Sequence, residues 1–563
     1  MAISPAVLYA SEVYYLGGPP GALHQLNPSF SFPQRLYDLV DFPKFGQYGQ
    51  DRSGEISGNL LEEVDTNNVG GNRSKSFLKD GTESLTELHL NLQEKLPQDY
   101  NMEGQLFLRK TNDTQIQKTR DLRVLQGNLK ILNANNLFEV GDFYGEFSQF
   151  VLGHNLEGIG AEYVPDNSIV KAKFVAGRSQ APDEGADKFE RNVVGGKVDI
   201  NPFNNSNIFS NFRIGAQVLS SYDDSSSIPT DANTVDLHNS VGSIDGDMSF
   251  KKIASMSYEV ARSADMANKF TLDDYKYGNA LRLQPRLDFG PLQLRYLYYY
   301  VEPRFYSDIG SAAWDKAQHQ VTADYTFNQK VSMSATENYY WNHLKDSPSA
   351  FRTINDEKDL SFNLKPLDSR KDFSIRPYAT YLQTNSDDSG DSLHSTTKTF
   401  GFTTNDSWGP SINYGVKYEF QNFISKANPF QSVYYERPGF NVSREQKFFG
   451  RRLYFSFQPG VQIRTLKSSN GKSDVNFTYS STGQYNCTDK LVFNFGLNAT
   501  VDNSDLPLSD SFGTQSFAEF DYTLSEKRST HFVVRLEKNR YVYTDGTQSY
   551  KESRVIGKLV TNF

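Results

Sequence analysis

The sequence predicts an all-β fold, a single large up-and-down barrel of antiparallel strands that crosses a membrane. Three observations predict it. Short polar or Gly/Pro turns recur at a spacing of roughly forty residues, longer polar stretches lie between them, and the flanking segments alternate apolar and polar residues. Transmembrane barrels have this rhythm, with short periplasmic turns at one rim and long extracellular loops at the other.

The short turns divide the chain into hairpins. They are predicted at Pro97-Gln98-Asp99, Asn133-Ala134-Asn135, Pro165-Asp166-Asn167, Asn204-Asn205-Ser206, Lys251-Lys252, Gly290-Pro291, Asn328-Gln329-Lys330, Ser369-Arg370-Lys371, Gly409-Pro410, Gly450-Arg451, Thr488-Asp489-Lys490 and Glu526-Lys527-Arg528. With the terminal strands included, they predict about 26 strands, within a range of roughly 24 to 28.

The segments between turns alternate strictly. From Leu491 to Val501 every odd-numbered residue is apolar, and Ile412 to Phe420 repeats the pattern on even positions. A period of two places successive side chains on opposite faces of a sheet. A soluble β-sandwich or β-helix also alternates, but its strands usually span roughly five or six residues, whereas these segments run to about ten to fifteen. The length favours the membrane barrel.

Composition agrees with a barrel in which only alternate residues meet lipid. The chain is 37% hydrophobic and 14% aromatic, and its mean hydropathy is −0.59. Aromatic clusters at Tyr298-Tyr299-Tyr300, Tyr339-Tyr340-Trp341 and Tyr434-Tyr435 are predicted near strand ends, where interfacial girdles belong.

The N-terminal region differs from the rest. Residues 1–10 end in Ala-Val-Leu-Tyr-Ala, which predicts the remnant of a signal peptide, and residues 11–53 lack a strand period, which predicts a periplasmic or lumen-threading tail. Residues 54–563 are predicted to form the barrel. It begins with a short strand from Glu55 to Val64, and a polar loop is expected from Asp65 to Glu83.

No catalytic or metal-binding constellation is recognisable. The 8 histidines are scattered without ligand spacing, and the single cysteine, Cys487, permits neither an internal disulfide nor a covalent haem attachment. The net charge of −9 without a basic stripe argues against nucleic acid. We therefore expect no enzyme activity, no catalytic residues, no bound metal and no cofactor.

The polar faces of the strands are expected to line the lumen, because charged residues in mid-strand are tolerated where they meet water. The candidate lumen-facing residues are Asp324, Arg376, Lys417, Glu419, Gln458, Arg464, Asn494 and Asn498.

The last strand carries a further motif. Val555, Gly557, Leu559 and Phe563 share one parity. The segment resembles the assembly signal of outer-membrane proteins, a final strand ending in phenylalanine, and the resemblance implies recognition of Phe563, Leu559 and Gly557 by the barrel-assembly machinery. It departs from the common pattern at Thr561, where a bulky apolar residue is usual, and Gly557 lies one place further from the terminal aromatic than usual.

The segment from Val140 to Leu152 resembles a Gly-Asp-Phe/Tyr-Tyr strand of some uncharacterised large outer-membrane barrels. Gly141 and Gly145 in it are expected to allow a bend or a close backbone contact.

Size suggests the function. A cylinder of about 26 strands is roughly 50 Å across at the backbone and leaves roughly 30 Å of lumen. An open hole of this width is incompatible with a membrane barrier, so the barrel is expected to be flattened, blocked by inward loops or filled. In architecture the chain resembles the sheath barrels of porin–cytochrome conduits, which enclose a multihaem cytochrome, although it lacks the Cys-x-x-Cys that one group of them carries.

Two functions follow. The first is a passage or sheath across the bacterial outer membrane, either porin-like or enclosing a partner such as a multihaem cytochrome. The second is an export or secretion barrel similar to the ushers. The expected partners are outer-membrane lipid, lipopolysaccharide and the assembly machinery, while a periplasmic or lumen-inserted protein is left open.

Overall fold

The computed structural model describes most of residues 54–563. Its gaps are 77, 118, 146, 166–168, 184–185, 204–205, 207, 230–235, 252, 268–275, 314, 343–351, 371, 388–391, 410, 468–472, 505–509, 526–528 and 545. The expected signal remnant and N-terminal tail lie outside the described residues.

The described chain forms 26 strands and two short 3-10 helices, η2 (Arg73–Lys75) and η4 (Pro429–Gln431). The strands are β1 (Gly54–Gly71), β2 (Gly81–Lys95), β3 (Asn101–Thr111), β4 (Arg123–Leu132), β5 (Asn136–Tyr144), β6 (Asn155–Tyr163), β7 (Val170–Gln180), β8 (Glu190–Ile200), β9 (Phe209–Asp224), β10 (Leu237–Phe250), β11 (Ala254–Ala267), β12 (Lys276–Asp288), β13 (Leu292–Val301), β14 (Lys316–Asn328), β15 (Val331–Asn342), β16 (Thr353–Leu364), β17 (Ser374–Ser386), β18 (His394–Trp408), β19 (Ile412–Ser425), β20 (Val433–Phe448), β21 (Arg451–Leu466), β22 (Ser473–Asn486), β23 (Leu491–Ser504), β24 (Ser511–Ser525), β25 (Thr530–Tyr543) and β26 (Tyr550–Asn562).

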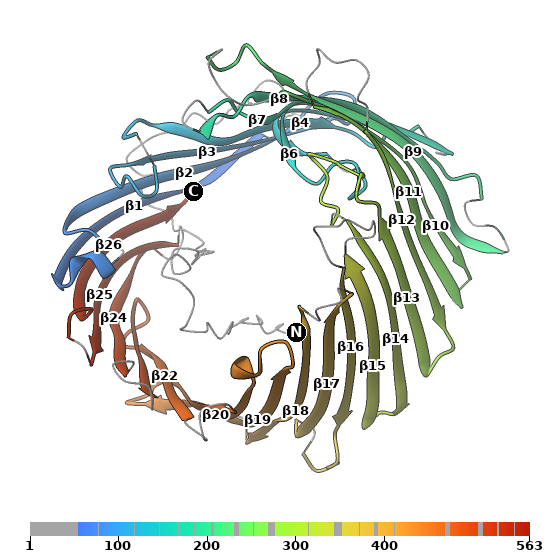
Figure 1. The fold of residues 1–563 in the computed structure, drawn as a ribbon. Helices are drawn as coiled ribbons and strands as arrows, with labels where there is room; N and C mark the ends of the chain where they lie inside the picture. Colours follow the sequence, from blue (N-terminus) through green and yellow to red (C-terminus); the bar gives the residue numbers. More distant parts are fainter. Residues whose placement is uncertain are drawn as a thin grey trace.

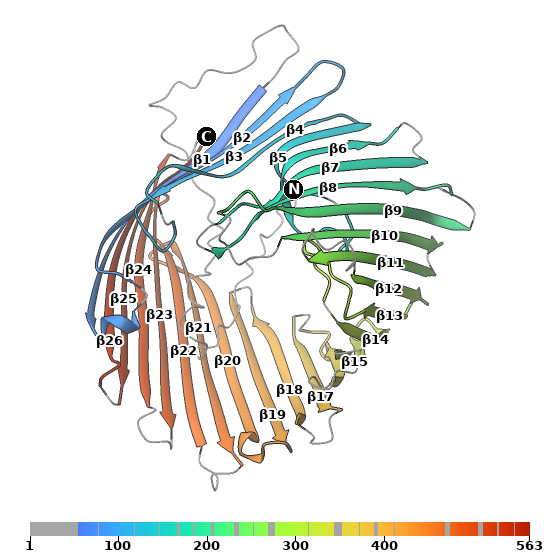
Figure 2. The ribbon, with the colours of Figure 1, turned by 45° about the horizontal axis from the view of Figure 1, so that its top comes forward.

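The strands form one closed ring (Figures 1 and 2). Each strand pairs antiparallel with its neighbours in sequence, and β26 pairs antiparallel with β1 from Asn59–Asn562 to Gly71–Tyr550. The backbone of Phe563 extends this seam, since it exchanges two 2.9 Å hydrogen bonds with Gly58. The prediction of about 26 strands in an up-and-down barrel is therefore confirmed, and two stacked sheets are excluded.

The register fixes the dimensions. A path that steps from each residue to its direct partner on the next strand comes back to β1 after one circuit of the ring. It arrives about 28 residues along the strand from where it started. With about 4.8 Å between strands and about 3.4 Å per residue, this stagger tilts the strands by about 37° and gives a backbone diameter of about 50 Å.

Most of the predicted short turns join the expected strands. At the turn predicted at Gly450-Arg451, the two connecting residues are instead Phe449 and Gly450, both with positive φ, and Arg451 already begins β21. Such mirror-image turns match the twist of the strands they connect. The turn predicted at 526–528 lies outside the described residues, as do parts of those at 165–167, 204–206, 251–252, 369–371 and 409–410.

The predicted loop from Asp65 to Glu83 is wrong. Strand β1 continues to Gly71 and β2 begins at Gly81, so only residues 72–80 connect them. Two of the polar residues that suggested a loop, Asp65 and Asn67, belong to the inner face and are 5% and 4% exposed. The Oδ2 of Asp65 lies 2.6 Å from Nε of Arg554 on β26. Polar side chains therefore occupy inward positions of β1, and the alternation of apolar and polar residues that would predict a strand is absent there.

Both ends of the outer wall carry aromatic side chains. Tyr298 and Tyr300 end β13, and Trp341 ends β15, at the rim of long loops. At the opposite rim Phe327 and Trp408 are 54% and 70% exposed. The aromatic clusters therefore lie at strand ends, as the sequence predicted.

Between these ends the outer wall is mainly apolar. Side chains such as Val218, Phe400 and Leu536 are 58%, 54% and 46% exposed although they stand in mid-strand. An apolar band flanked by aromatic residues is the surface that lipid requires.

Candidate functional site

The inner wall carries a lattice of ion pairs that extends across many strands. Glu419 on β19 is one centre of it. Its carboxylate accepts a 2.6 Å hydrogen bond from the Tyr378 hydroxyl, pairs with Arg437 at 2.5 Å, and lies 3.4 Å from Nζ of Lys417. The Glu419 carboxylate therefore links side chains of three strands, β17, β19 and β20. It pairs with two cationic side chains, Lys417 and Arg437.

The structure places the other candidate lumen residues on the same inner face. Asp324 pairs with Arg295 at 2.5 Å and accepts a 2.6 Å hydrogen bond from Ser334. Arg464 pairs with Asp474 at 3.2 Å, and Asn494 donates to Glu519 at 3.0 Å.

Three candidates have looser surroundings. Gln458 and Asn498 face Ser480 across their respective strand pairs. Arg376 shares the face of Tyr378 and makes no ion pair within the described part of the chain. These eight residues therefore do not converge on a single point, but are distributed over the wall from β14 to β23.

A second ion-pair network crosses the seam that closes the barrel. Arg554 on β26 contacts Asp65 of β1 and lies 3.7 Å from Glu537 of β25, while Lys558 pairs with Glu63 at 2.7 Å. Opposite charges directly across neighbouring strands stabilise their register.

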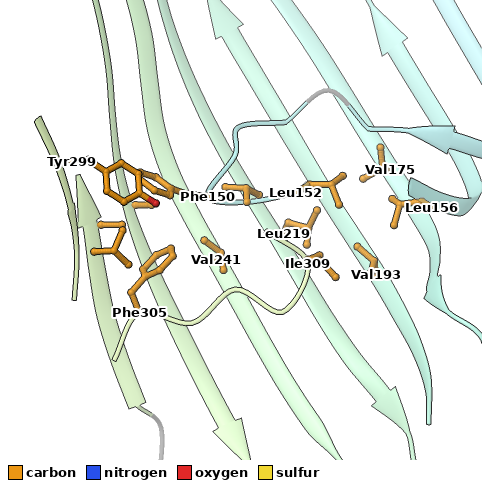
Figure 3. Packing of buried hydrophobic residues seen from close by; sticks show 14 of the residues in the cluster. Phe150, Leu152, Leu156, Val175, Val193, Leu219, Val241, Tyr299, Phe305 and Ile309 are labelled. Atoms are coloured by element: carbon orange, nitrogen blue, oxygen red, sulfur yellow. The ribbon is translucent and has the colours of Figure 1, made fainter. Parts of the chain in front are cut away.

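A third part of the inner wall is apolar instead. From β6 to β13 a stripe of buried residues crosses the strands (Figure 3). It consists of Leu156, Val175, Val193, Leu219, Val241, Ala261, Ala280, Tyr299 and Val301. Their sequence neighbours Val194, Val218 and Val260 are 42%, 58% and 53% exposed on the outer wall. These strands are thus apolar on both faces at one level.

Two long loops cover the stripe from inside the ring (Figures 1 and 3). The first, residues 145–154 between β5 and β6, buries Phe150, Val151 and Leu152 completely, each at 0% exposure. A side chain at Gly145 would lie only 2.5 Å from Leu152, which explains the glycine there. The predicted strand through Leu152 is wrong, because β5 ends at Tyr144; the predicted close backbone contact does occur, since a Cβ at Gly141 would lie 2.0 Å from Gly127 O.

The second loop, residues 302–315 between β13 and β14, is held by apolar and polar contacts. Phe305 and Ile309 are 2% exposed. The backbone of the loop rests on β12, where a Cβ at Gly278 would lie 2.0 Å from the Phe305 nitrogen. Asn239 donates to the Tyr306 carbonyl at 2.9 Å, and Ser263 accepts a 3.0 Å hydrogen bond from the Tyr306 N–H.

Asp308 is the main polar anchor of this loop. Its side chain is 1% exposed, lies 3.2 Å from Nε of Arg191, and accepts hydrogen bonds of 2.8 Å from the Ser221 hydroxyl. Burial raises the pKa of the Asp308 carboxyl above its ordinary value, although the Arg191 guanidinium opposes that shift.

The two loops also bind each other. Gly153 N–H donates to the Ile309 carbonyl at 2.6 Å, and Ser311 N–H donates to the Gln149 carbonyl at 2.9 Å. They therefore form one shelf, hereafter the docked shelf (residues 147–154 and 302–313), on one side of the lumen. The docked shelf covers part of the inner wall and narrows the lumen on that side (Figure 1).

The sequence predicted long polar connections between the hairpins but did not reveal the apolar stripe beneath this one. The available signal was the breakdown of alternation at Val193-Val194 and Val218-Leu219, where consecutive residues are apolar. A strand buried on both faces has this pattern. Within the described part of the chain no cluster of three metal-binding side chains occurs, and no helix there has the length and apolarity to span a bilayer.

Comparison with known proteins gives remote similarities only. No family model matches the chain, and no curated protein matches it. Among solved structures, the P pilus usher (PapC) translocation pore is 9% identical with a TM-score of 0.34, covering 90% of this chain and 99% of its own. OccK3 of Pseudomonas aeruginosa is 10% identical with a TM-score of 0.27, covering 90% of this chain and 96% of its own.

A BenF-like porin from Pseudomonas fluorescens Pf-5 is also 10% identical, with a TM-score of 0.27 and coverage of 91% of this chain and 99% of its own. At these scores the similarity assigns neither family nor function.

Proposed function

We propose that this chain is an integral barrel of a bacterial outer membrane and that its lumen is a water-filled passage narrowed by the docked shelf. One observation carries the proposal: the ion-pair lattice lies on the inner wall, while the outer wall between the aromatic ends is apolar. Charged groups require water or a polar partner, and exposed apolar side chains require lipid. This arrangement is the inverse of a soluble barrel with a dry core.

The width supports a passage. A backbone diameter of about 50 Å leaves a lumen roughly 30 Å wide after the inward side chains are subtracted. The side chains of the inner wall cannot fill a lumen of this width. Cations and anions alternate along that wall and neutralise one another, as Glu419 does with Arg437. We therefore expect weak selectivity for charge and a passage limited mainly by size.

Planar-bilayer recording of the purified, refolded chain tests the proposal. A stable conductance in the nanosiemens range, with little preference between potassium and chloride, is expected. No conductance from protein that has inserted into the bilayer would overturn it.

The sheath for a multihaem cytochrome is a second candidate, because the same polar wall could contact a protein. Haem absorbance that co-purifies with the chain from native membranes, together with a closed passage, would favour the sheath. An export barrel remains a weaker candidate, since no observation on the described residues favours it.

A further inference from the structure

Three neighbouring cations on the outer wall have no counter-ion within the described part of the chain. Lys538 and Arg540 of β25 and Lys551 of β26 are exposed, and none of the three forms an ion pair or side-chain hydrogen bond with a described residue. Arg540 and Lys551 are direct cross-strand partners, and Lys538 is paired with Ser553. The three side chains therefore lie on one face, with Cα atoms within roughly 5 to 8 Å of one another.

This cationic triad (Lys538, Arg540 and Lys551) lies beside the apolar band. In the next register position toward the short turns, Leu536 pairs with Val555, and these side chains are 46% and 47% exposed. Beyond that edge the outward neighbours become polar, because Lys538 faces Ser516 on β24 and Ser553 faces Asn68 on β1.

The height of the triad matches the surface of a bilayer. Lys538 lies eight residues from Thr530 at the short-turn end of β25, which for strands tilted about 37° is a vertical distance of about 22 Å. The apolar band of such barrels is about 25 Å tall. The triad thus lies where hydrocarbon gives way to headgroups, on the long-loop side.

Two other outward cations, Arg178 and Lys358, are neutralised by the protein. Arg178 pairs with Glu157 and, at 3.3 Å, with Glu190. Lys358 pairs with Asp356 at 3.0 Å and with Glu337 at 3.3 Å. The triad therefore lacks the acidic partners that Arg178 and Lys358 have, and repulsion among three neighbouring cations favours an external anion.

We propose that the triad binds the phosphorylated headgroup of an outer-leaflet glycolipid, a lipid A-type molecule whose acyl chains lie on the apolar band beside Leu536 and Val555. The inference rests on the proposed function, because it requires the long loops to face the outside of the cell. The hydroxyl of Ser553 and the side-chain amide of Asn68 supply further hydrogen-bond partners for phosphate and sugar oxygens. Both parts of the ligand, charged head and apolar tail, thus have a complementary surface.

The test measures binding of diphosphorylated lipid A to the full chain in detergent by native mass spectrometry. The variant is K538Q/R540Q/K551Q. The matched control is R178Q/K358Q/K398Q, which also removes three positive charges from the outer face. Lys398 of β18 has the outward parity of Phe400, and its Nζ lies 5.9 Å from the centroid of the Tyr381 ring. We expect the first variant to weaken binding at least about tenfold and the control to change it less than about threefold.

Three results would overturn the inference: equal weakening in both variants, equal binding of lipid A without phosphates, or displacement of lipid A by inorganic phosphate at the same concentration. The last would identify a general anion site. Bilayer insertion and conductance of the same preparations separate this test from the proposed function. Wild-type conductance in K538Q/R540Q/K551Q is expected, whereas failure of the unmodified chain to insert would refute the proposed function instead.

Discussion

Replacing Phe150 by alanine should release the docked shelf without unfolding the barrel. Phe150 is fully buried between the loop and the wall, with ring centroids 5.6 Å from Tyr299 and 5.7 Å from Phe305. Removing a buried phenylalanine typically costs about 3 to 5 kcal/mol. Because the 26 strands keep their backbone pairing, this cost should fall mainly on docking of the loop.

The lower figure of about 3 kcal/mol corresponds to an increase of about a hundredfold in the undocked population. Hydrogen–deuterium exchange measures that population at two amides, those of Gly153 and Ser311, which bond across the shelf. Their protection should fall by about a hundredfold in F150A. Phe520→Ala, on the lipid side where the ring is 44% exposed, is the matched control and should leave both amides unchanged.

Exchange at these amides that changes by less than about threefold in F150A would refute the docking argument. A general loss of protection in neighbouring strands would instead show that Phe150 supports the wall itself. Heat-modifiable migration on gels distinguishes the two outcomes, because only a folded barrel resists denaturation by detergent.

Three further predictions concern the seam, the terminus and the pH. Arg554→Met leaves Asp65 buried without its partner and should lower the free energy of unfolding by roughly 3 kcal/mol, measured by urea titration in detergent; a midpoint equal to wild type would contradict this. Removing Phe563 should impair insertion, and unchanged heat-modifiable migration would refute its role. Because burial raises the pKa of Asp308, protonation favours the docked loop: the stabilisation is present in acid and is lost as pH rises through that raised pKa. Exchange in residues 302–313, corrected for intrinsic rate, should therefore show tighter docking at low pH, and Asp308→Asn, which keeps Arg191 and every other group, should remove the dependence.

The sequence predicted the barrel well because turns and alternation are local properties. Strand number, turn positions and the two-faced pattern of segments such as Leu491 to Val501 require only neighbours in the chain. The prediction failed at β1, where Asp65 and Asn67 face inward as buried polar residues. Asp65 is paired with Arg554, which lies 489 residues away, so no local pattern could identify this segment as part of a strand.

The docked shelf could not be predicted for the same reason. Its two loops have no period, and the contact between Gln149 and Ser311 joins residues 162 apart in sequence. The paired apolar residues at Val193-Val194 and Val218-Leu219 indicate that something covers the inner wall, but not what covers it. Docking of these loops depends on how well their shape fits the inner wall and on individual polar contacts such as those of Asp308. Neither property produces a periodic pattern in the sequence.

Conductance in planar bilayers tests the central claim most directly. If water fills the lumen beside the docked shelf, the purified chain should produce stable open events in the nanosiemens range, and F150A should increase their size or frequency. Inserted, heat-modifiable protein that never conducts, in wild type and F150A alike, would contradict the account.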